Sequence, residues 1–231
     1  MKKTAFTLAE VLITLVIIGV VAALTIPNLM QKYTDQETVK KLQKFYSNLS
    51  NAYSLAVKDN GPVDEWNLDG RTGTGSAQVY EILFKPYFKI SRNCMLNKSE
   101  KCVPDTPYKN ISGSSQYQWY VNDTHYKIVL DDGAHVWWSV NNSGTGFYIN
   151  YDVNGKKEPN KWGIDTFEFW VNKGKMVPQG AGSRYNVSYY CSPNTDYVNG
   201  GLVCTAWVIY KGNMDYLHCN DLSWTGKDKC K

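Results

Sequence analysis

The chain has 231 residues, of which 43% are hydrophobic and 20% are charged. This length and composition fit one ordinary domain with or without an appendage, and exclude a multidomain assembly and wholesale disorder. Residues 1–60 hold seven Lys and four acidic residues, so that 18 basic and 17 acidic side chains remain in residues 61–231. Because this larger part is close to neutral, we do not expect nucleic acid as a partner.

Aromatic residues and cysteines are distributed very unevenly. Residues 1–60 contain only five aromatic residues, whereas residues 61–231 contain the other 27, including all eight Trp, together with all six Cys. The chain therefore consists of two physically different parts.

The N-terminal part contains a long apolar segment. Residues 11–31 carry no charge, and as a helix they would extend roughly 30 Å, which is the thickness of a bilayer's hydrocarbon core. A secretory signal peptide would have a shorter apolar region and a cleavage motif of small residues, which residues 27–30 do not provide. A simple membrane anchor would leave Glu10 unexplained, since a carboxylate at the edge of an apolar span usually has a partner or a function.

The residues around Glu10 carry a family resemblance. A basic leader, Lys2-Lys3-Thr4-Ala5, precedes Phe6-Thr7-Leu8-Ala9-Glu10 and the apolar segment. This arrangement resembles the prepilin family, the precursors of type IV pilins and type II secretion pseudopilins. Ala5 departs from the glycine that usually precedes the cleavage point, and cleavage after Ala is expected to be slower.

The resemblance implies processing and assembly. A prepilin peptidase would cut between Ala5 and Phe6 and methylate the new amino group of Phe6. Glu10 would then pair in the filament with that amino group, on a neighbouring subunit or its own, and set the register between subunits. Alternatively, Glu10 extends toward the lipid headgroups before assembly, and both roles can apply at different stages.

The resemblance also implies partners, location and domains. Expected partners are other pilin or pseudopilin subunits, the peptidase, an inner-membrane assembly platform and, before assembly, membrane lipid. The expected location is the bacterial inner membrane and then a periplasmic or extracellular filament. Residues 1–5 would be the leader, residues 6–30 the membrane and filament-core helix, and residues 31–231 the head.

One long helix is expected over residues 7–58. Beyond Pro27 the pattern becomes amphipathic, and Asp59-Asn60-Gly61-Pro62 is a strong helix stop. The apolar positions of the second half recur at spacings of three and four and should lie on a sheet: Val39, Leu42, Phe45, Tyr46, Leu49, Ala52, Tyr53 and Ala56.

Residues 61–110 have weaker patterns. The glycine-rich stretch 70–76 is interpreted as a surface loop, because a phosphate-binding loop would end in Gly-Lys-Ser/Thr and follow an apolar strand. A short helix is expected over residues 77–84, ending before Pro86.

From residue 116 onward the pattern is that of β-structure. Aromatic and branched residues predict strands at 118–121, 126–130, 134–140, 146–153 and 166–171, with a hairpin turn at 131–133. Residues 185–190 and 203–210 fit either edge strands or helix. The expected fold class is α+β and pilin-like, with one long helix packed on an antiparallel sheet of four or five strands and with disulfide-tied loops.

The six cysteines indicate disulfides and an oxidising, exported compartment. They are Cys94, Cys102, Cys191, Cys204, Cys219 and Cys230. Six cysteines allow 15 pairings, among which the sequential one is the simplest because each loop is short. A zinc site is the alternative to disulfides for these cysteines, but no Cys-x-x-Cys spacing occurs. Lys2 and Lys3 should stay in the cytoplasm by the positive-inside rule, which places the head in the periplasm.

The head shows no catalytic motif. Its histidines, His125, His135 and His218, stand in no metalloprotease motif and next to no nucleophile motif. We expect His125 and His135 to lie on the surface of hairpin strands, and we expect no enzyme activity. Trp137 and Trp138 are adjacent, so one of them must face away from any single core.

Residues 152–165 are the one stretch that suggests a cofactor. Asp152, Asn154, Asn160 and Asp165 could surround a calcium ion, with Glu158 nearby. Lys156 opposes this, and Asx turns between two strands explain the same residues without a metal. The stretch also resembles a segment in the heads of minor-pilin-like proteins, which implies a structural role, so we expect no cofactor, with calcium as the open alternative.

The sequence as a whole predicts a structural subunit of a type IV pilus or type II secretion pseudopilus. Its size and three expected disulfides favour a minor subunit. The alternative is a surface-anchored binding module, an adhesin or uptake component, whose aromatic residues suit carbohydrate or protein ligands. An anchored enzyme would require a convergent cluster of catalytic side chains in the folded head.

Overall fold

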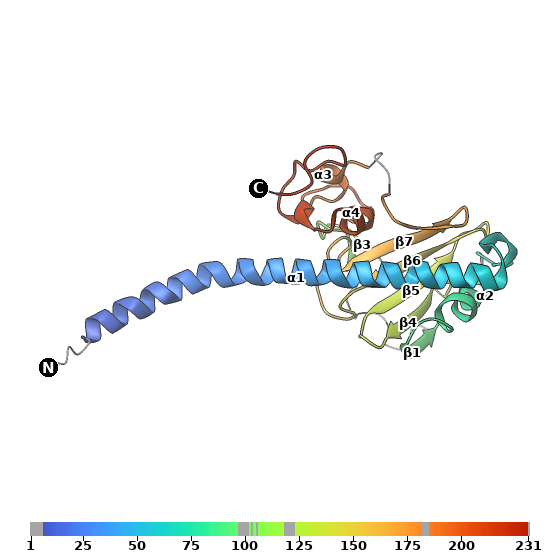
Figure 1. Cartoon of the computed structure of the whole chain (residues 1–231), viewed down its shortest axis with the longest axis horizontal. Coiled ribbons are helices and arrows are strands. Elements are labelled where there is room, and N and C mark those ends of the chain that lie inside the picture. The colour runs from blue at the N-terminus through green and yellow to red at the C-terminus, as the bar shows by residue number, and fades with distance from the viewer. Residues whose placement is uncertain are drawn as a thin grey trace. The chain divides into compact units, whose positions relative to one another are not determined.

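The computed structural model describes residues 7–96, 102, 104, 106–117, 123–181 and 185–230 (Figure 1). The expected leader, the Ala5/Phe6 cleavage point and the strand expected at 118–121 lie outside the described residues. Helix α1 (Leu8–Asn60) agrees with the single long helix expected over residues 7–58. The chain forms two compact units, Met1–Glu37 and Thr38–Lys231.

The second unit is built on a six-stranded antiparallel sheet. Its strands follow the order β1-β4-β5-β6-β7-β8. Their bounds are β1 Ile90–Met95, β4 Tyr126–Leu130, β5 His135–Val140, β6 Phe147–Asp152, β7 Thr166–Asn172 and β8 Lys175–Pro178. A separate ribbon pairs β2 (Tyr108–Lys109) with β3 (Gln116–Tyr117). Strands β4 to β7 were predicted, whereas β1, β8 and the ribbon were not, so the expectation of four or five strands was too low.

The second half of α1 packs across one face of this sheet, as the amphipathic pattern predicted (Figure 1). Phe45 stacks on Tyr151 of β6 with ring centroids 3.9 Å apart, and Tyr46 stacks on Phe169 of β7. Leu42, Leu49 and Ala56 are completely buried. Burying each large apolar side chain stabilises the fold by about 1.5–3 kcal/mol, so this stripe holds the helix on the sheet.

A second helical segment covers the same face beside β4 and β5. It consists of α2 (Gly73–Val79) followed by a π-helical turn, Tyr80–Phe84. Phe84 stacks on Trp138, and the Trp138 indole N–H donates to the Ser76 carbonyl over 2.9 Å. The helix predicted at 77–84 is therefore present.

The surface loop predicted at 70–76 was wrong for its second half. Thr72 caps α2 by accepting a hydrogen bond from the Thr74 N–H, and Gly75 and Ser76 are buried. A Cβ at Gly75 would collide with the backbone of Asp69. Glycine is present there because two backbone segments approach closely, and not because a loop needs flexibility.

The C-terminal segment, residues 185–230, packs beside strands β7 and β8 of the sheet (Figure 1). Residues 185–190 and 203–210, whose sequence fitted either edge strands or helix, contain helices. These are α3 (Val187–Tyr190) and α4 (Cys204–Lys211). Two short 3-10 helices, Val63–Glu65 and Asp215–Leu217, also occur in the part of the chain that the structure describes. Gly212, with φ +67°, ends α4 in the left-handed conformation that glycine adopts easily.

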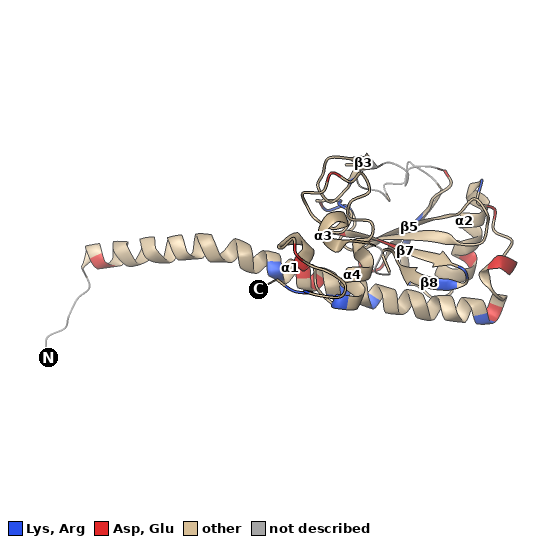
Figure 2. Cartoon of the chain, turned by 90° about the horizontal axis from the view of Figure 1, so that it is seen from above, with Lys and Arg blue, Asp and Glu red and all other residues tan. Residues whose placement is uncertain are grey.

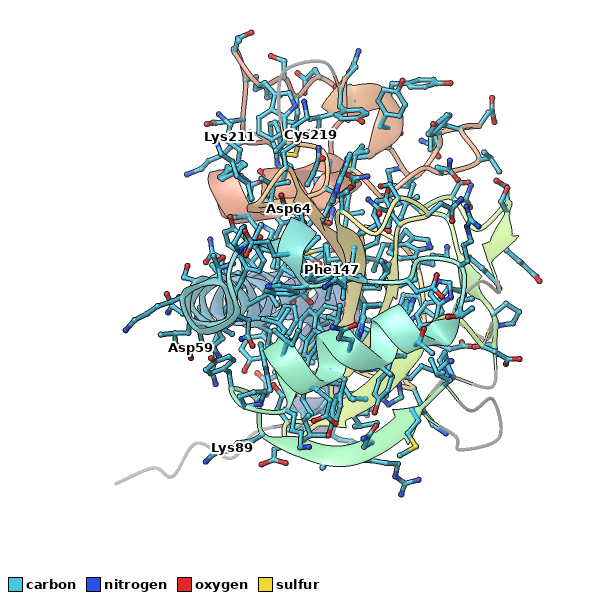
Figure 3. All side chains as sticks on the ribbon, turned by 90° about the vertical axis from the view of Figure 1, so that its right-hand side faces the viewer. Asp59, Asp64, Lys89, Phe147, Lys211 and Cys219 are labelled. Carbon is cyan, nitrogen blue, oxygen red and sulfur yellow. A yellow bond between two sulfur atoms is a disulfide. The ribbon has the colours of Figure 1, made fainter. Side chains whose placement is uncertain are left out.

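Three disulfides tie the head. They join Cys94 to Cys102, Cys191 to Cys204 and Cys219 to Cys230, with Cα atoms 6.1, 5.6 and 5.9 Å apart. This is the sequential pairing that the short spacings favoured. Figure 3 shows Cys219 and Lys211 in the C-terminal segment.

The close approach at Gly75 predicts an unusual response to substitution. Gly75→Ala adds helix propensity, yet it should destabilise the head by about 1–3 kcal/mol, because the new methyl group collides with Asp69. Urea unfolding followed by tryptophan fluorescence measures this change. Thr74→Ala, at an exposed position of the same helix, is the matched control and should cost less than about 0.5 kcal/mol. A Gly75→Ala protein as stable as the control would contradict the packing argument.

Candidate functional site

Helix α1 begins with a capping box formed by Thr7 and Glu10. The Glu10 carboxylate accepts hydrogen bonds from the Thr7 N–H and from the Thr7 hydroxyl, both over 2.8 Å. The Glu10 N–H in turn donates to the Thr7 hydroxyl oxygen over 3.3 Å. Because these reciprocal bonds satisfy backbone donors that no helical turn can serve, they fix the start of the helix. Sequence reasoning singled out Glu10 and missed its local partner Thr7.

The helix that follows presents apolar side chains to its surroundings. Figure 2 shows an acidic residue near its start and then a long stretch without charge. The exposed large apolar residues of this stretch are Leu8, Val11, Leu12, Ile13, Leu15, Val16, Ile17, Ile18, Val20, Val21, Leu24, Ile26, Leu29 and Met30. By length and composition the helix can cross a membrane. An apolar surface of this extent requires lipid or other chains around it.

The calcium candidates lie together at the end of β6, whose last residue is Asp152, and in the loop that leads to β7. They are on the face of the sheet opposite to helix α1, which is called the second face below. Asp152 accepts hydrogen bonds from the N–H groups of Asn154 and Gly155, and its other oxygen accepts the Tyr108 hydroxyl proton over 2.6 Å. Asp165 accepts hydrogen bonds from the N–H groups of Asn160 and Lys161 over 2.8 and 2.7 Å. The two carboxylates thus hold the loop in the manner of Asx turns.

The hydrogen bonds of this loop engage its carboxylate oxygens and leave two of its amide oxygens without a partner among the described residues. All four carboxylate oxygens of Asp152 and Asp165 already accept N–H or O–H donors. The side-chain oxygens of Asn154 and Asn160 are buried and accept no hydrogen bond from any residue that the structure describes, and they are the groups that a cation would engage. Within the described residues, no group of three or more His, Cys, Asp or Glu side chains could hold a metal. Glu158 is exposed.

Burial dominates the electrostatics of this loop. It raises the pKa of Asp165 to about 6, against the hydrogen bonds that lower it. Burial, with a smaller contribution from the Asp165 charge, raises the pKa of Asp152 well above its usual range. The donors around both groups therefore offset only part of the cost of removing them from water.

The histidines do not lie where the sequence placed them. His135 of β5 is buried, not on the sheet surface, and its Nδ1 has no hydrogen-bond partner in the part of the chain that the structure describes. His125 is half-buried and directly precedes β4. Burial lowers the pKa of both to about 4, assisted by the charges of Lys156 and Lys127 respectively. Both rings are therefore neutral at physiological pH. His218 is exposed in the C-terminal segment.

A row of buried side chains crosses the second face of the sheet from strand to strand. Lys127, Trp137, Asn150 and Glu168 are cross-strand neighbours on β4, β5, β6 and β7. The Trp137 indole N–H donates to the Asn150 amide oxygen over 3.2 Å, and that amide donates to Glu168 over 3.1 Å. Lys127 donates to the His125 carbonyl over 2.7 Å. Sequence reasoning missed Glu168 and Lys127, because it assumed that this face meets water.

Burial raises the pKa of Glu168 to about 8, although a hydrogen bond with the Gln179 side chain lowers it in part. A carboxyl group in such surroundings is mostly protonated at neutral pH. The row and the Asp152 loop together bring His, Asp, Glu and Lys side chains to one face. Their polar contacts are with one another and with the covering backbone, which is the arrangement of a structural polar layer.

Comparison with known proteins identifies the chain's class. Residues 1–26 match the model of the prokaryotic N-terminal methylation motif. This motif, the apolar helix and the head of helix and sheet define a prepilin-type protein with a pilin-like fold, which is a pilin- or pseudopilin-like subunit. The motif implies processing by a prepilin peptidase and assembly with other pilin subunits.

A second family model matches most of the chain. Residues 28–212 match the model of the family described as Family of unknown function (DUF6613), and the chain belongs to that family. Neither the curated proteins nor the solved structures contain a match.

The hydrogen-bonded loop predicts how the protein responds to calcium. If the loop bound Ca²⁺, a free Ca²⁺ concentration a hundred times the dissociation constant would raise the melting temperature by about 5–10 °C. Because the carboxylates of Asp152 and Asp165 are engaged, we expect millimolar Ca²⁺ to shift it by less than about 1 °C. The comparison is a thermal melt with Ca²⁺ against one with chelator. A rise that Asn160→Ala abolishes would establish the calcium site instead.

Glu168 predicts a pH-dependent difference in stability. Since its folded pKa is about 8 and its ordinary value is 4.5, the folded state binds more protons between these values, and stability falls as pH rises. Glu168→Gln removes this loss, so the variant should gain stability relative to the native protein from pH 4.5 to pH 8. Urea unfolding of both proteins across this range measures the difference.

Glu81→Gln, at an exposed carboxylate, supplies the control, because a surface substitution should change the free energy of unfolding by less than about 0.5 kcal/mol. The argument fails if Glu168→Gln shows an equally small difference across that range of pH.

Proposed function

We propose that this protein is a minor subunit of a type IV pilus or a type II secretion pseudopilus, assembled through helix α1. The observation that carries the proposal is the methylation motif continuing into a helix whose large apolar side chains up to Met30 are between 42% and 77% exposed. Before assembly this surface is covered by lipid. In the filament the equivalent helices of other subunits replace the lipid.

Processing exposes the group that Glu10 needs. The peptidase hydrolyses the Ala5–Phe6 bond, and the new amino group of Phe6 is methylated and stays positively charged. Lys2 and Lys3 hold the leader in the cytoplasm, and the head lies in the periplasm until the assembly platform draws the subunit into the filament. The three disulfides are compatible with that compartment.

Glu10 supplies the charge that sets the register between subunits. Inside a bundle of apolar helices a carboxylate is costly unless a cation pairs with it, and the Phe6 amino group of a neighbouring subunit is such a cation. The capping box holds the Glu10 carboxylate at the first turn of α1, four residues from Phe6. Glu10 thus has two roles in this proposal: it caps the first turn of α1, and its charge sets the register of α1 against the helices of other subunits.

The head supports the proposal that the protein is a minor subunit of the filament. It is large for a subunit that only repeats along a fibre, and three disulfides and two covered sheet faces make it a substantial structure. The choice between pilus and secretion system depends on the partner subunits.

Variants of the capping box separate the two roles of Glu10. Glu10→Gln keeps an oxygen that accepts from Thr7 but removes the charge, whereas Thr7→Ala removes the hydroxyl of the box and keeps the charge. If register depends on charge, Glu10→Gln and Glu10→Ala should lower incorporation into filaments at least about tenfold, and Thr7→Ala should incorporate nearly normally. Quantitative immunoblotting of sheared filaments measures incorporation.

Mass spectrometry of the mature N-terminus is the control for processing. All variants should begin at methylated Phe6, so that a loss of filaments reflects assembly. Normal incorporation of Glu10→Gln would refute the register role. A native protein that retains Met1, or is cut elsewhere, would refute the proposed processing.

A further inference from the structure

Residues 185–201, which comprise α3, the two residues before it and most of the loop that leads to α4, have the composition of a binding surface. Eleven of the 17 residues in 185–201 are Tyr, Ser, Asn or Gly. These are the residues that antibody binding loops use, because Tyr provides a large, rigid contact area and Ser and Asn provide adaptable hydrogen bonds. Neither the sheet nor helix α1 requires such a composition.

The four tyrosines of residues 185–201 form one cluster. Tyr190 meets Tyr185, Tyr189 and Tyr197 edge to face, with ring centroids 5.6, 5.0 and 4.9 Å apart. Each ring restrains its neighbours, so the cluster presents a firm aromatic surface. Tyr189 is 48% exposed, which leaves part of its ring for an external contact.

A depression of about 460 Å³ adjoins the same loop. Ser192, Pro193 and Asn194 form one wall, and residues 216–220, which include His218 and Asn220, form the other. A volume of this size accommodates a small ligand such as a mono- or disaccharide. None of these lining residues is Asp, Glu, Lys or Arg.

Disulfide bonds restrain the backbone of both walls of the depression. Cys191, which precedes Ser192, is bonded to Cys204, and Cys219, which lines the depression, is bonded to Cys230 (Figure 3). The side-chain amides of Asn194 and Asn220 are exposed and make no hydrogen bond to the described residues. Preorganised walls with unengaged amides reduce the entropy that a ligand's binding would cost.

We propose that this depression binds a neutral sugar. An uncharged sugar offers hydroxyl groups that can accept hydrogen bonds from, and donate them to, the amides of Asn194 and Asn220. The uncharged lining favours it over a phosphate or a carboxylate, which would need a cationic partner. The site is separate from the N-terminal assembly motif, so the protein would carry sugar recognition on the head of a filament subunit.

Saturation-transfer NMR tests the site on the full-length protein in a detergent that contains no sugar. Glucose, N-acetylglucosamine and lactose serve as probes, and we expect at least one to bind with a dissociation constant of about millimolar order. Asn194→Ala and Asn220→Ala should each raise that constant about two- to tenfold. Inorganic phosphate at equal concentration should not compete.

Asn142→Ala is the matched control, since Asn142 is an exposed asparagine outside the depression. It should leave sugar binding unchanged, and near-UV circular dichroism should show every variant folded. The proposal is overturned if no probe binds, if the Asn194 and Asn220 variants bind like the control, or if phosphate displaces the sugar. Incorporation of these variants into filaments should stay normal, so failure here is distinct from failure of the assembly role.

Discussion

Trp137 and Trp138 are consecutive residues of β5, and both are buried. Because consecutive side chains of a strand point to opposite faces, both faces of the sheet must be covered. Trp138 packs with Phe84 and Tyr126 on the helical side, and Trp137 packs with Tyr108 and Trp162 on the other. A helix covers the first face with its own backbone satisfied. The second face is covered by loops, whose backbone donors need acceptors, and this explains the buried Asp152 and Asp165.

This two-sided burial also decides how much of the fold the sequence could predict. Strands β4 to β7 combine alternation with aromatic and branched residues, and were predicted. Strand β1 carries Ser91, Arg92 and Asn93 at an edge with irregular register, and β8 is a short strand after a tight turn, so neither has the hydrophobic pattern of a central strand. His135 was misplaced because a polar residue at an alternating position normally faces water, whereas here a loop covers it.

The two candidate sites differ in how far sequence could reach them. Glu10 lies within five consecutive residues that carry the family motif, and its partner Thr7 is three positions away. The depression in the head is assembled from residues 192–194 and 216–220, which become neighbours only when the C-terminal segment folds. No local pattern marks such a pair of segments in advance. The sequence indicated only that the aromatic residues of the head suit carbohydrate or protein ligands, without locating a cavity.

The disulfide pattern has a consequence for how the head is made. Each bridge joins a cysteine to the next one along the chain, at separations of 8, 13 and 11 residues, and no bridge spans another. A head that crosses a membrane beginning with its N-terminal end therefore delivers the first cysteine of each pair followed directly by its native partner. An oxidase that joins thiols in their order of arrival produces the correct set without later exchange between bridges. The order of the cysteines thus makes the head compatible with cross-linking during export, before the sheet is complete.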